Sequence, residues 1–166
     1  MVKMQNSETK QRILDTAERL FAQNGIEGTS VRTITAAAGV NVAAIHYHFG
    51  SKEALAETVY SRRLQPINSE RLRLLSECFT PQTRDDLCLE DIIKAFIGPL
   101  LRLKDDPEHG GGDFMHLMGR IYSEPGDFKL VILGQFKEVA QQFTEAFAQA
   151  LPHLSRRELY LRLHLR

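Results

Sequence analysis

The sequence is poor in the residues and runs that would place it outside the cell or in a membrane. It has no tryptophan and only two cysteines, Cys78 and Cys88, in 166 residues. Two cysteines ten residues apart, without a CxxC pair, make no disulfide framework, so we expect both to be reduced thiols. Apolar runs such as 130–133 are far shorter than the roughly 20 residues of a membrane-spanning helix, and no charged-then-apolar leader opens the chain. We therefore expect a cytoplasmic protein without a membrane partner.

The motifs of common enzyme classes are also missing. No phosphate-binding GxxxxGK[ST], HExxH or GxGxxG is present. The HGGG at 109–112 is similar to the oxyanion loop of lipases, but that chemistry needs a GxSxG elbow, which the chain lacks. His46 and His48 point about 200° apart on a helix, so they cannot bind one metal together. We predict no enzyme, no cofactor and no metal site, and we interpret HGGG as a helix connection.

Net charge is zero overall but unevenly distributed. Residues 1–65 hold 8 Lys and Arg against 6 Asp and Glu, a charge of +2, and the remainder holds 13 against 15, a charge of −2. The amino-terminal third is therefore mildly basic, and its histidines can add charge at lower pH.

Apolar residues recur at helical spacing along nearly the whole chain, and no stretch alternates as a strand does. Stop signals at Gly25, Gly39 and Gly50 divide the first part of this pattern, and Pro66 marks a point where a helix must end or bend. The predicted helices cover 7–24, 31–38, 42–49, 52–64, 66–78, 87–104, 113–123 and 127–151, with another from Ser155. The fold class is therefore all-α.

Two short helices joined by a tight turn, at 31–38 and 42–49, are typical of a helix-turn-helix. The turn needs a residue tolerant of positive φ, and Gly39 provides it. The apolar residues that can close a small core around the motif are Ile13, Leu14, Leu20, Phe21, Ile34, Val40, Ile45 and Phe49.

The start and outer face of the second short helix carry small side chains, namely Val42, Ala43 and Ala44, followed by His46. Small groups let a helix approach closely in a DNA major groove and contact thymine methyls, and an imidazole can hydrogen-bond a base edge or phosphate. This pattern indicates a DNA-reading helix.

Groups suited to phosphate surround these helices. Thr29, Ser30 and Arg32 lie at the start of the first short helix, where free N–H groups favour anions. Tyr47 offers a hydroxyl. Lys52 lies in the first turn of the next helix, where the helix dipole disfavours a cation unless an external anion compensates it. Such contacts would position the protein on DNA while a few base contacts specify the sequence.

Residues from about 7 to 64 resemble the DNA-binding domain of the tetracycline-repressor (TetR) family of bacterial transcriptional regulators. The matching segments are ILDTAERLFAQNG, GTSVRTITAAAGV and YHFGSKEAL, in the expected order. The YHFGSKE-type recognition helix is similar to that of regulators answering to fatty acids or other hydrophobic effectors. One difference is His46, where many family members carry tyrosine.

The resemblance implies a DNA-binding domain at 1–64 with three helices, and a helical effector-binding and dimerisation domain at 65–166. The implied DNA contacts are Thr29, Ser30, Arg32, Asn41, Val42, Ala43, Ala44, His46, Tyr47, His48 and Lys52. Bulky apolar side chains of the second domain are the implied effector contacts: Phe96, Leu100, Phe114, Met118, Ile121, Tyr122 and Phe136. Arg120 joins them because His116 and Arg120 are four residues apart on one helix face and could hold an acidic head group; the alternative is a solvated face. Family members use their last two helices for the dimer and usually continue past this chain's last residue, so we expect its carboxyl end to be cut short.

The predicted function is a transcriptional regulator that binds a palindromic operator as a homodimer. We expect a repressor released by a small hydrophobic effector, a fatty-acid derivative or an aromatic compound, through a swing of the helix at 52–64 with a hinge at Pro66. The alternatives are an effector-independent repressor or architectural DNA-binding protein, an adaptor without DNA binding, and a hydrolase. The sequence leaves the effector, the operator and the choice between repression and activation open.

Overall fold

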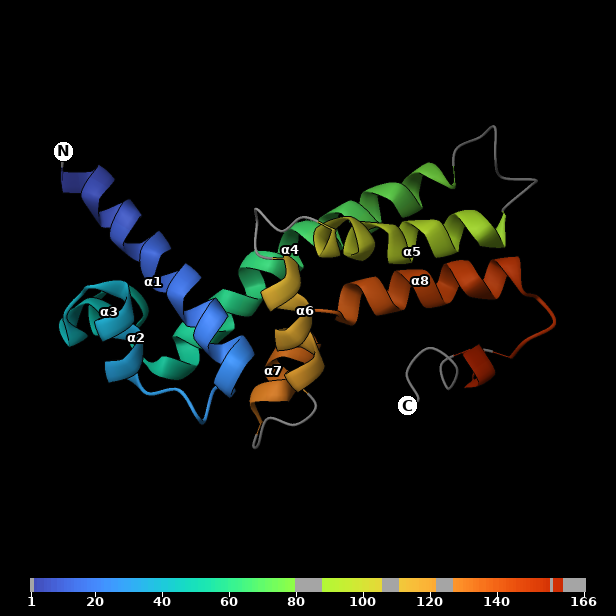
Figure 1. Ribbon diagram of the computed structural model, residues 1–166. Helices are drawn as coiled ribbons and strands as arrows, with labels where there is room; N and C mark the ends of the chain where they lie inside the picture. The colour runs from blue at the N-terminus through green and yellow to red at the C-terminus, as the bar shows by residue number, and fades with distance from the viewer. Residues whose placement is uncertain (1, 80–87, 106–110, 122–126, 156, 160–166) are drawn as a thin grey trace. The chain divides into compact units, whose positions relative to one another are not determined.

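The computed structural model describes residues 2–79, 88–105, 111–121, 127–155 and 157–159, all in helices, turns or connections and none in a strand (Figure 1). The helices are α1 (Val2–Asn24), α2 (Val31–Ala38), α3 (Val42–Phe49), α4 (Lys52–Glu77), α5 (Leu89–Lys104), α6 (Gly111–Arg120), α7 (Phe128–Gly134) and α8 (Lys137–Ala150). The all-α prediction is confirmed. Most of the helix predicted from Ser155 lies outside the described residues, but its start carries a reciprocal cap between Ser155 and Glu158.

The described chain forms two compact units, and each is taken by itself. The first comprises Met1–Arg63 and Lys104–Leu133, and the second comprises Leu64–Leu103 and Gly134–Arg166. These units are defined by packing, whereas the predicted division into 1–64 and 65–166 is one of function, so that division stays a prediction.

In the first unit α1 contacts both α2 and α6, and α2 contacts α3. The predicted small core is present: Ile13, Leu14, Leu20, Phe21, Ile34 and Ile45 are buried, while Val40 and Phe49 are half-buried. Tyr60 of α4 adds a fully buried ring whose hydroxyl donates to the carbonyl of Leu117, 3.0 Å away. The pair of short helices is therefore held on a packed base.

The boundaries of α2 and α3 follow from their caps. Ser30 and Asn41 have extended backbone and accept hydrogen bonds from the N–H groups of the first turns. Gly39 ends α2 in the left-handed region at φ 63°, and the N–H of Val40 then reaches the carbonyl of Thr35 at 3.0 Å. The predicted bounds of both helices and the glycine turn are confirmed.

The prediction of two helices separated at Pro66 is wrong, because α4 runs through it without a break. A proline in a helix removes one hydrogen bond, here to the carbonyl of Arg62, and costs about 3 kcal/mol. Buried side chains on the same helix, Leu64, Ile67 and Leu75, each contribute about 1.5–3 kcal/mol. Packing therefore outweighs the proline, which itself is exposed.

The single long helix predicted over 127–151 is also wrong. It is divided into α7 and α8, with Gly134 ending the first and Phe136 preceding the second. Glycine disfavours helix continuation, and the carbonyl of Gln135 instead accepts a hydrogen bond from the side-chain amide of Asn68 at 3.0 Å.

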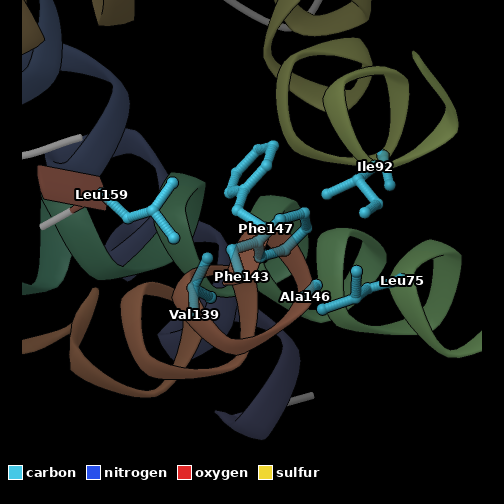
Figure 2. Packing of buried hydrophobic residues seen from close by; sticks show 8 residues of the cluster. Leu75, Ile92, Val139, Phe143, Ala146, Phe147 and Leu159 are labelled. Carbon is cyan, nitrogen blue, oxygen red and sulfur yellow. The ribbon is translucent and has the colours of Figure 1, made fainter. Parts of the chain in front are cut away.

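The second unit is built around α8 and the carboxyl part of α4. Its core contains Leu75, Ile92, Ala95, Val139, Phe143, Ala146, Phe147 and Leu159, all buried. Figure 2 shows the rings of Phe143 and Phe147 in the middle of this cluster, with Leu159 on one side and Ile92 on the other. Phe143 also packs against Phe96 of α5, with ring centroids 4.9 Å apart.

Candidate nucleic-acid interface and effector residues

Three phosphate contacts are predicted at the start of α2, and one of their side chains is buried while two are exposed. Thr29 is only 1% exposed, and its hydroxyl donates to the carbonyl of Gly25 at 2.7 Å. Ser30 and Arg32 are exposed, and the Ser30 oxygen already caps the helix through Thr33 N–H at 3.0 Å. Thr29 therefore supports the loop, and we leave it out of the proposed interface.

The amino-terminal end of α3 is open to solvent. Asn41 and Ala43 are exposed, Val42 is 41% exposed, and Ala44 is half-buried. The side-chain oxygen of Asn41 accepts the N–H of Ala44 at 2.9 Å, which fixes the first turn. Nothing larger than Val42 stands on this end, so it can approach another surface closely.

The second half of α3 carries the aromatic and imidazole groups. Tyr47 is 76% exposed. His46 is exposed, and its Nδ1 lies 3.0 Å from the carbonyl oxygen of Gly50. Because a carbonyl only accepts, the Nδ1 carries the proton of this hydrogen bond, and the other ring nitrogen, Nε2, is left for a different contact. His48 is half-buried and packs edge-on to Tyr47 with centroids 5.0 Å apart.

At the start of α4, Lys52 is half-buried and its ammonium donates to the carbonyl of Ile26 at 3.0 Å. An ammonium has three donors, so this bond leaves others for an anion. Ser51 caps the helix through the N–H of Ala54 at 3.1 Å. Hydrogen bonds from its own backbone N–H and from Ser51 lower the pKa of Glu53, so a carboxylate partly balances Lys52 there.

The first turns of α2 and α3 contain no acidic residue. Carboxylates are favoured at helix starts because they compensate the positive end of the dipole, so both ends remain free for an external anion. Hydroxyl, guanidinium and ammonium groups lie near these ends, and only small side chains stand on the first turn of α3. This arrangement fits a polyanion with a groove.

The predicted effector residues are distributed over both units. Phe114 and Ile121 are fully buried in the first unit and Met118 is half-buried there. In the second unit the half-buried side chains are Phe96, Leu100 and Phe136. Tyr122 lies outside the described residues. The residues of each unit pack with their own neighbours, and their joint role in a pocket stays a prediction.

Arg120, which is predicted to hold an acidic head group together with His116, lies at the end of α6. It is exposed, and its Nη2 donates to the carbonyl of Gln23 at 2.9 Å. That contact ties the end of α6 to α1. The guanidinium therefore already has a structural partner, and its role as an effector anchor stays a prediction.

Neither a metal site nor a membrane span was found in the described part of the chain. No group of three or more His, Cys, Asp or Glu there could hold an ion. Across the same residues, no helix is long and apolar enough to cross a bilayer.

Two family models cover most of the chain. Residues 13–59 match the model for bacterial regulatory proteins of the tetR family, and residues 94–166 match the model for the tetracyclin repressor-like C-terminal domain. The chain belongs to the TetR family. The first match spans α2, α3 and their turn, where the sequence resemblance also lies.

Individual relatives agree with this assignment. The HTH-type transcriptional regulator AcrR of Shigella flexneri is 45% identical over 58 residues, which are 35% of this chain and 27% of AcrR. This TetR-family chain thus matches about a quarter of that relative's length. Two solved structures share the fold. The structure of AibR in complex with isovaleryl coenzyme A and operator DNA matches with a TM-score of 0.66 at 19% identity, over 95% of this chain and 88% of the AibR chain. The structure of a SmeT–triclosan complex matches with a TM-score of 0.60 at 24% identity, over 92% of this chain and 67% of the SmeT chain. At these identities the two structures show the shared fold.

The sequence-based predictions for this TetR-family chain did not include Arg71, a buried polar residue. Arg71 lies on the apolar stripe of α4 that includes Leu64, Ile67 and Leu75, and it is buried with them. An arginine at this spacing within an apolar stripe is a signal visible in the sequence.

Proposed function

We propose that the chain is a DNA-binding transcriptional regulator that inserts the amino-terminal end of α3 into the major groove. The observation that carries the proposal is the exposed start of α3, where Val42 and Ala43 stand beside a helix end without a carboxylate. A carboxylate there would repel the phosphate rails, and a bulky side chain would hold the helix away from the base edges.

The proposed contacts have distinct roles. Val42, Ala43, Ala44 and the Nε2 of His46 face base edges. Ser30, Arg32, Asn41, Tyr47 and Lys52 contact phosphates. His48, packed on Tyr47, supports that ring. Phosphate contacts supply affinity that falls with salt, and base contacts supply sequence preference.

We propose a homodimer on a palindromic operator. A two-fold axis places two recognition helices roughly 34–36 Å apart, one turn of DNA, and matches each to one half-site. In the resembled family the last helices build the dimer, which here gives α7, α8 and the segment from Ser155. AibR was solved with operator DNA, which supports this mode of use for a chain of the same fold.

We further propose that a small hydrophobic effector, a fatty-acid derivative or an aromatic compound, releases the operator. AibR and SmeT were each solved with a small molecule, isovaleryl coenzyme A and triclosan. Helix α4 offers a covalent connection through which effector binding can change DNA affinity. Its residues Lys52–Arg63 belong to the first unit, and its residues Leu64–Glu77 belong to the second. An effector changes DNA affinity only by its differential affinity for the two states, typically about 1–3 kcal/mol.

A titration against the DNA upstream of the chain's own coding region tests the proposal. Binding is followed by fluorescence anisotropy at several salt concentrations, with scrambled DNA of equal length as the control. We expect tighter binding to the upstream DNA, with a steep loss of affinity as salt rises. Equal affinity for both DNAs would contradict specific regulation. Specific binding that alkanoates and aromatic compounds leave unchanged would favour an effector-independent repressor.

A further inference from the structure

Arg71 is a buried cation in the second unit. Its side chain and backbone together are 5% exposed. The Nε donates to the carbonyl of Phe96 at 2.7 Å and Nη1 donates to the side-chain oxygen of Asn68 at 3.2 Å. The guanidinium carbon lies 4.6 Å from the centroid of the Phe96 ring. All of these partners are neutral.

Other arginines of the same unit have carboxylate partners. Arg73, two residues along α4, pairs with Glu70 and Glu77, and Arg102 pairs with Glu70 at 3.2 Å. Within the described residues Arg71 forms no ion pair, and burial lowers its pKa. Burying a charge is costly unless it is paired, so an unpaired guanidinium here is a feature to explain.

The surroundings of Arg71 suit an amphiphile. The Phe96 ring beneath the guanidinium packs on Phe143, which lies within the apolar cluster of Figure 2. One turn farther along α4 there is an open cleft of about 370 Å³ whose lining includes Leu74 and Ala95, the neighbour of Phe96, together with the charged side chains Glu77, Asp91, Lys94 and Arg102. Arg71 and Phe96 lie close to this lining in the sequence and are not part of it. Binding sites for small organic molecules begin at about this volume.

We propose that Arg71 binds the anionic head group of the effector, and that the effector is an organic acid with an apolar chain or ring. The planar fork of a guanidinium pairs with a carboxylate or a phosphate through two parallel hydrogen bonds. Binding would supply the missing counter-charge while Phe96 contacts the apolar part. This inference rests on the proposed effector-responsive function and gives the effector its chemical class.

Thermal unfolding of the 166-residue chain with a matched ligand series tests this assignment. The probes are straight-chain alkanoates of graded length, the alkyl phosphates of the same lengths, and the corresponding uncharged amides. We expect at least one acid to raise the Tm of the unaltered chain, and its amide to raise the Tm less. Comparing carboxylates with phosphates identifies which anion the site takes.

Two variants on the same helix separate a head-group site from general charge. Arg71→Met removes the buried cation, and Arg73→Met removes an exposed, paired one. We expect Arg71→Met to abolish the difference between acid and amide, with at least a tenfold loss of acid affinity, and Arg73→Met to preserve it. Without ligand, the Tm of Arg71→Met should be no lower than that of the unaltered chain, because an unpaired buried charge is removed. If this variant does not fold, Arg71→Gln gives the same comparison.

The assignment of Arg71 as the head-group site is wrong if no acid raises the Tm of the unaltered chain more than its amide does. It is also wrong if Arg71→Met retains the difference between acid and amide. DNA binding without ligand, measured in parallel, separates this from the proposed function. A chain that binds its upstream DNA but ignores every acid refutes the role of Arg71 alone, and a chain stabilised by acids that binds no specific DNA refutes the regulator proposal.

Discussion

The Nζ of Lys52 lies 3.0 Å from the carbonyl oxygen of Ile26, which joins the start of α4 to the loop after α1. The ammonium thus has an internal partner that the sequence pattern does not reveal. One bond uses one of three donors, so Lys52 can both hold the loop and contact a phosphate.

Lys52→Ala is therefore expected to change two properties. DNA affinity should fall alike for all sequences, with the slope of log affinity against log salt reduced by about one. Stability should fall by about 1 kcal/mol through loss of the Ile26 hydrogen bond. Anisotropy titrations and urea unfolding measure these. Lys94→Ala, which removes an exposed lysine paired with Glu90 in the second unit, is the control and should leave DNA binding unchanged. An unaltered salt slope for Lys52→Ala would remove Lys52 from the interface.

His46→Ala should affect specificity more than affinity. The Nδ1 bond to Gly50 orients the ring, so its Nε2 would read one position per half-site, and loss of that contact should reduce discrimination there by about 1–3 kcal/mol. Titrations against operators substituted one base pair at a time measure this. His116→Ala, an exposed histidine on α6, serves as the control. Equal losses on operator and random DNA would show that His46 does not read bases.

Pro66→Ala tests the hinge in α4. Alanine restores the hydrogen bond to the carbonyl of Arg62 and raises the helix propensity at that position, so α4 should become stiffer and more stable by about 1–3 kcal/mol. We expect a weaker change in operator affinity on adding a releasing compound. The measurement is operator affinity with and without that compound. If both affinities match those of the unaltered chain, Pro66 is not a hinge.

Gly39→Ala should destabilise the helix-turn-helix. Open space surrounds Gly39, so the cost is conformational: φ of 63° is the left-handed region, which costs a residue with a Cβ about 1–2 kcal/mol. Gly119→Ala is a matched control with opposite sign, because Gly119 lies in α6 with equally open space and alanine favours a helix by about 1 kcal/mol. Urea unfolding of both variants checks this pair, and a stabilised Gly39→Ala would contradict the role of the turn.

The short helices were predictable to the residue because local signals bound them. Ser30 and Asn41 cap their starts, and Gly39 and Gly50 follow their ends with positive φ. Pro66 is an equally strong local signal, yet α4 continues because burial of Leu64 and Ile67 outweighs one lost hydrogen bond. Local propensity decides where no tertiary contact opposes it.

The sequence predicted which residues form the candidate site, but not which of their side chains are buried. Val42, Ala43 and Tyr47 are exposed as a DNA-reading surface requires. Thr29 is buried, and its hydroxyl donates a hydrogen bond to the carbonyl of Gly25. The sequence does not specify the packing that buries this side chain. The missing charge partner of Arg71 emerges only from the packed second unit.

The most direct test of the central claim is the operator affinity of Ala43→Glu. A carboxylate at the start of α3 favours the helix dipole, so folding should be unaffected or slightly stabilised. The same charge would meet the phosphates and base edges of the groove, and we expect operator affinity to fall on the order of 100-fold, with Tm unchanged. Ser69→Glu, an exposed position on the part of α4 that belongs to the second unit, adds the same charge away from the proposed dimer helices and should bind DNA normally. If Ala43→Glu binds the operator as tightly as the unaltered chain does, the start of α3 does not enter the groove.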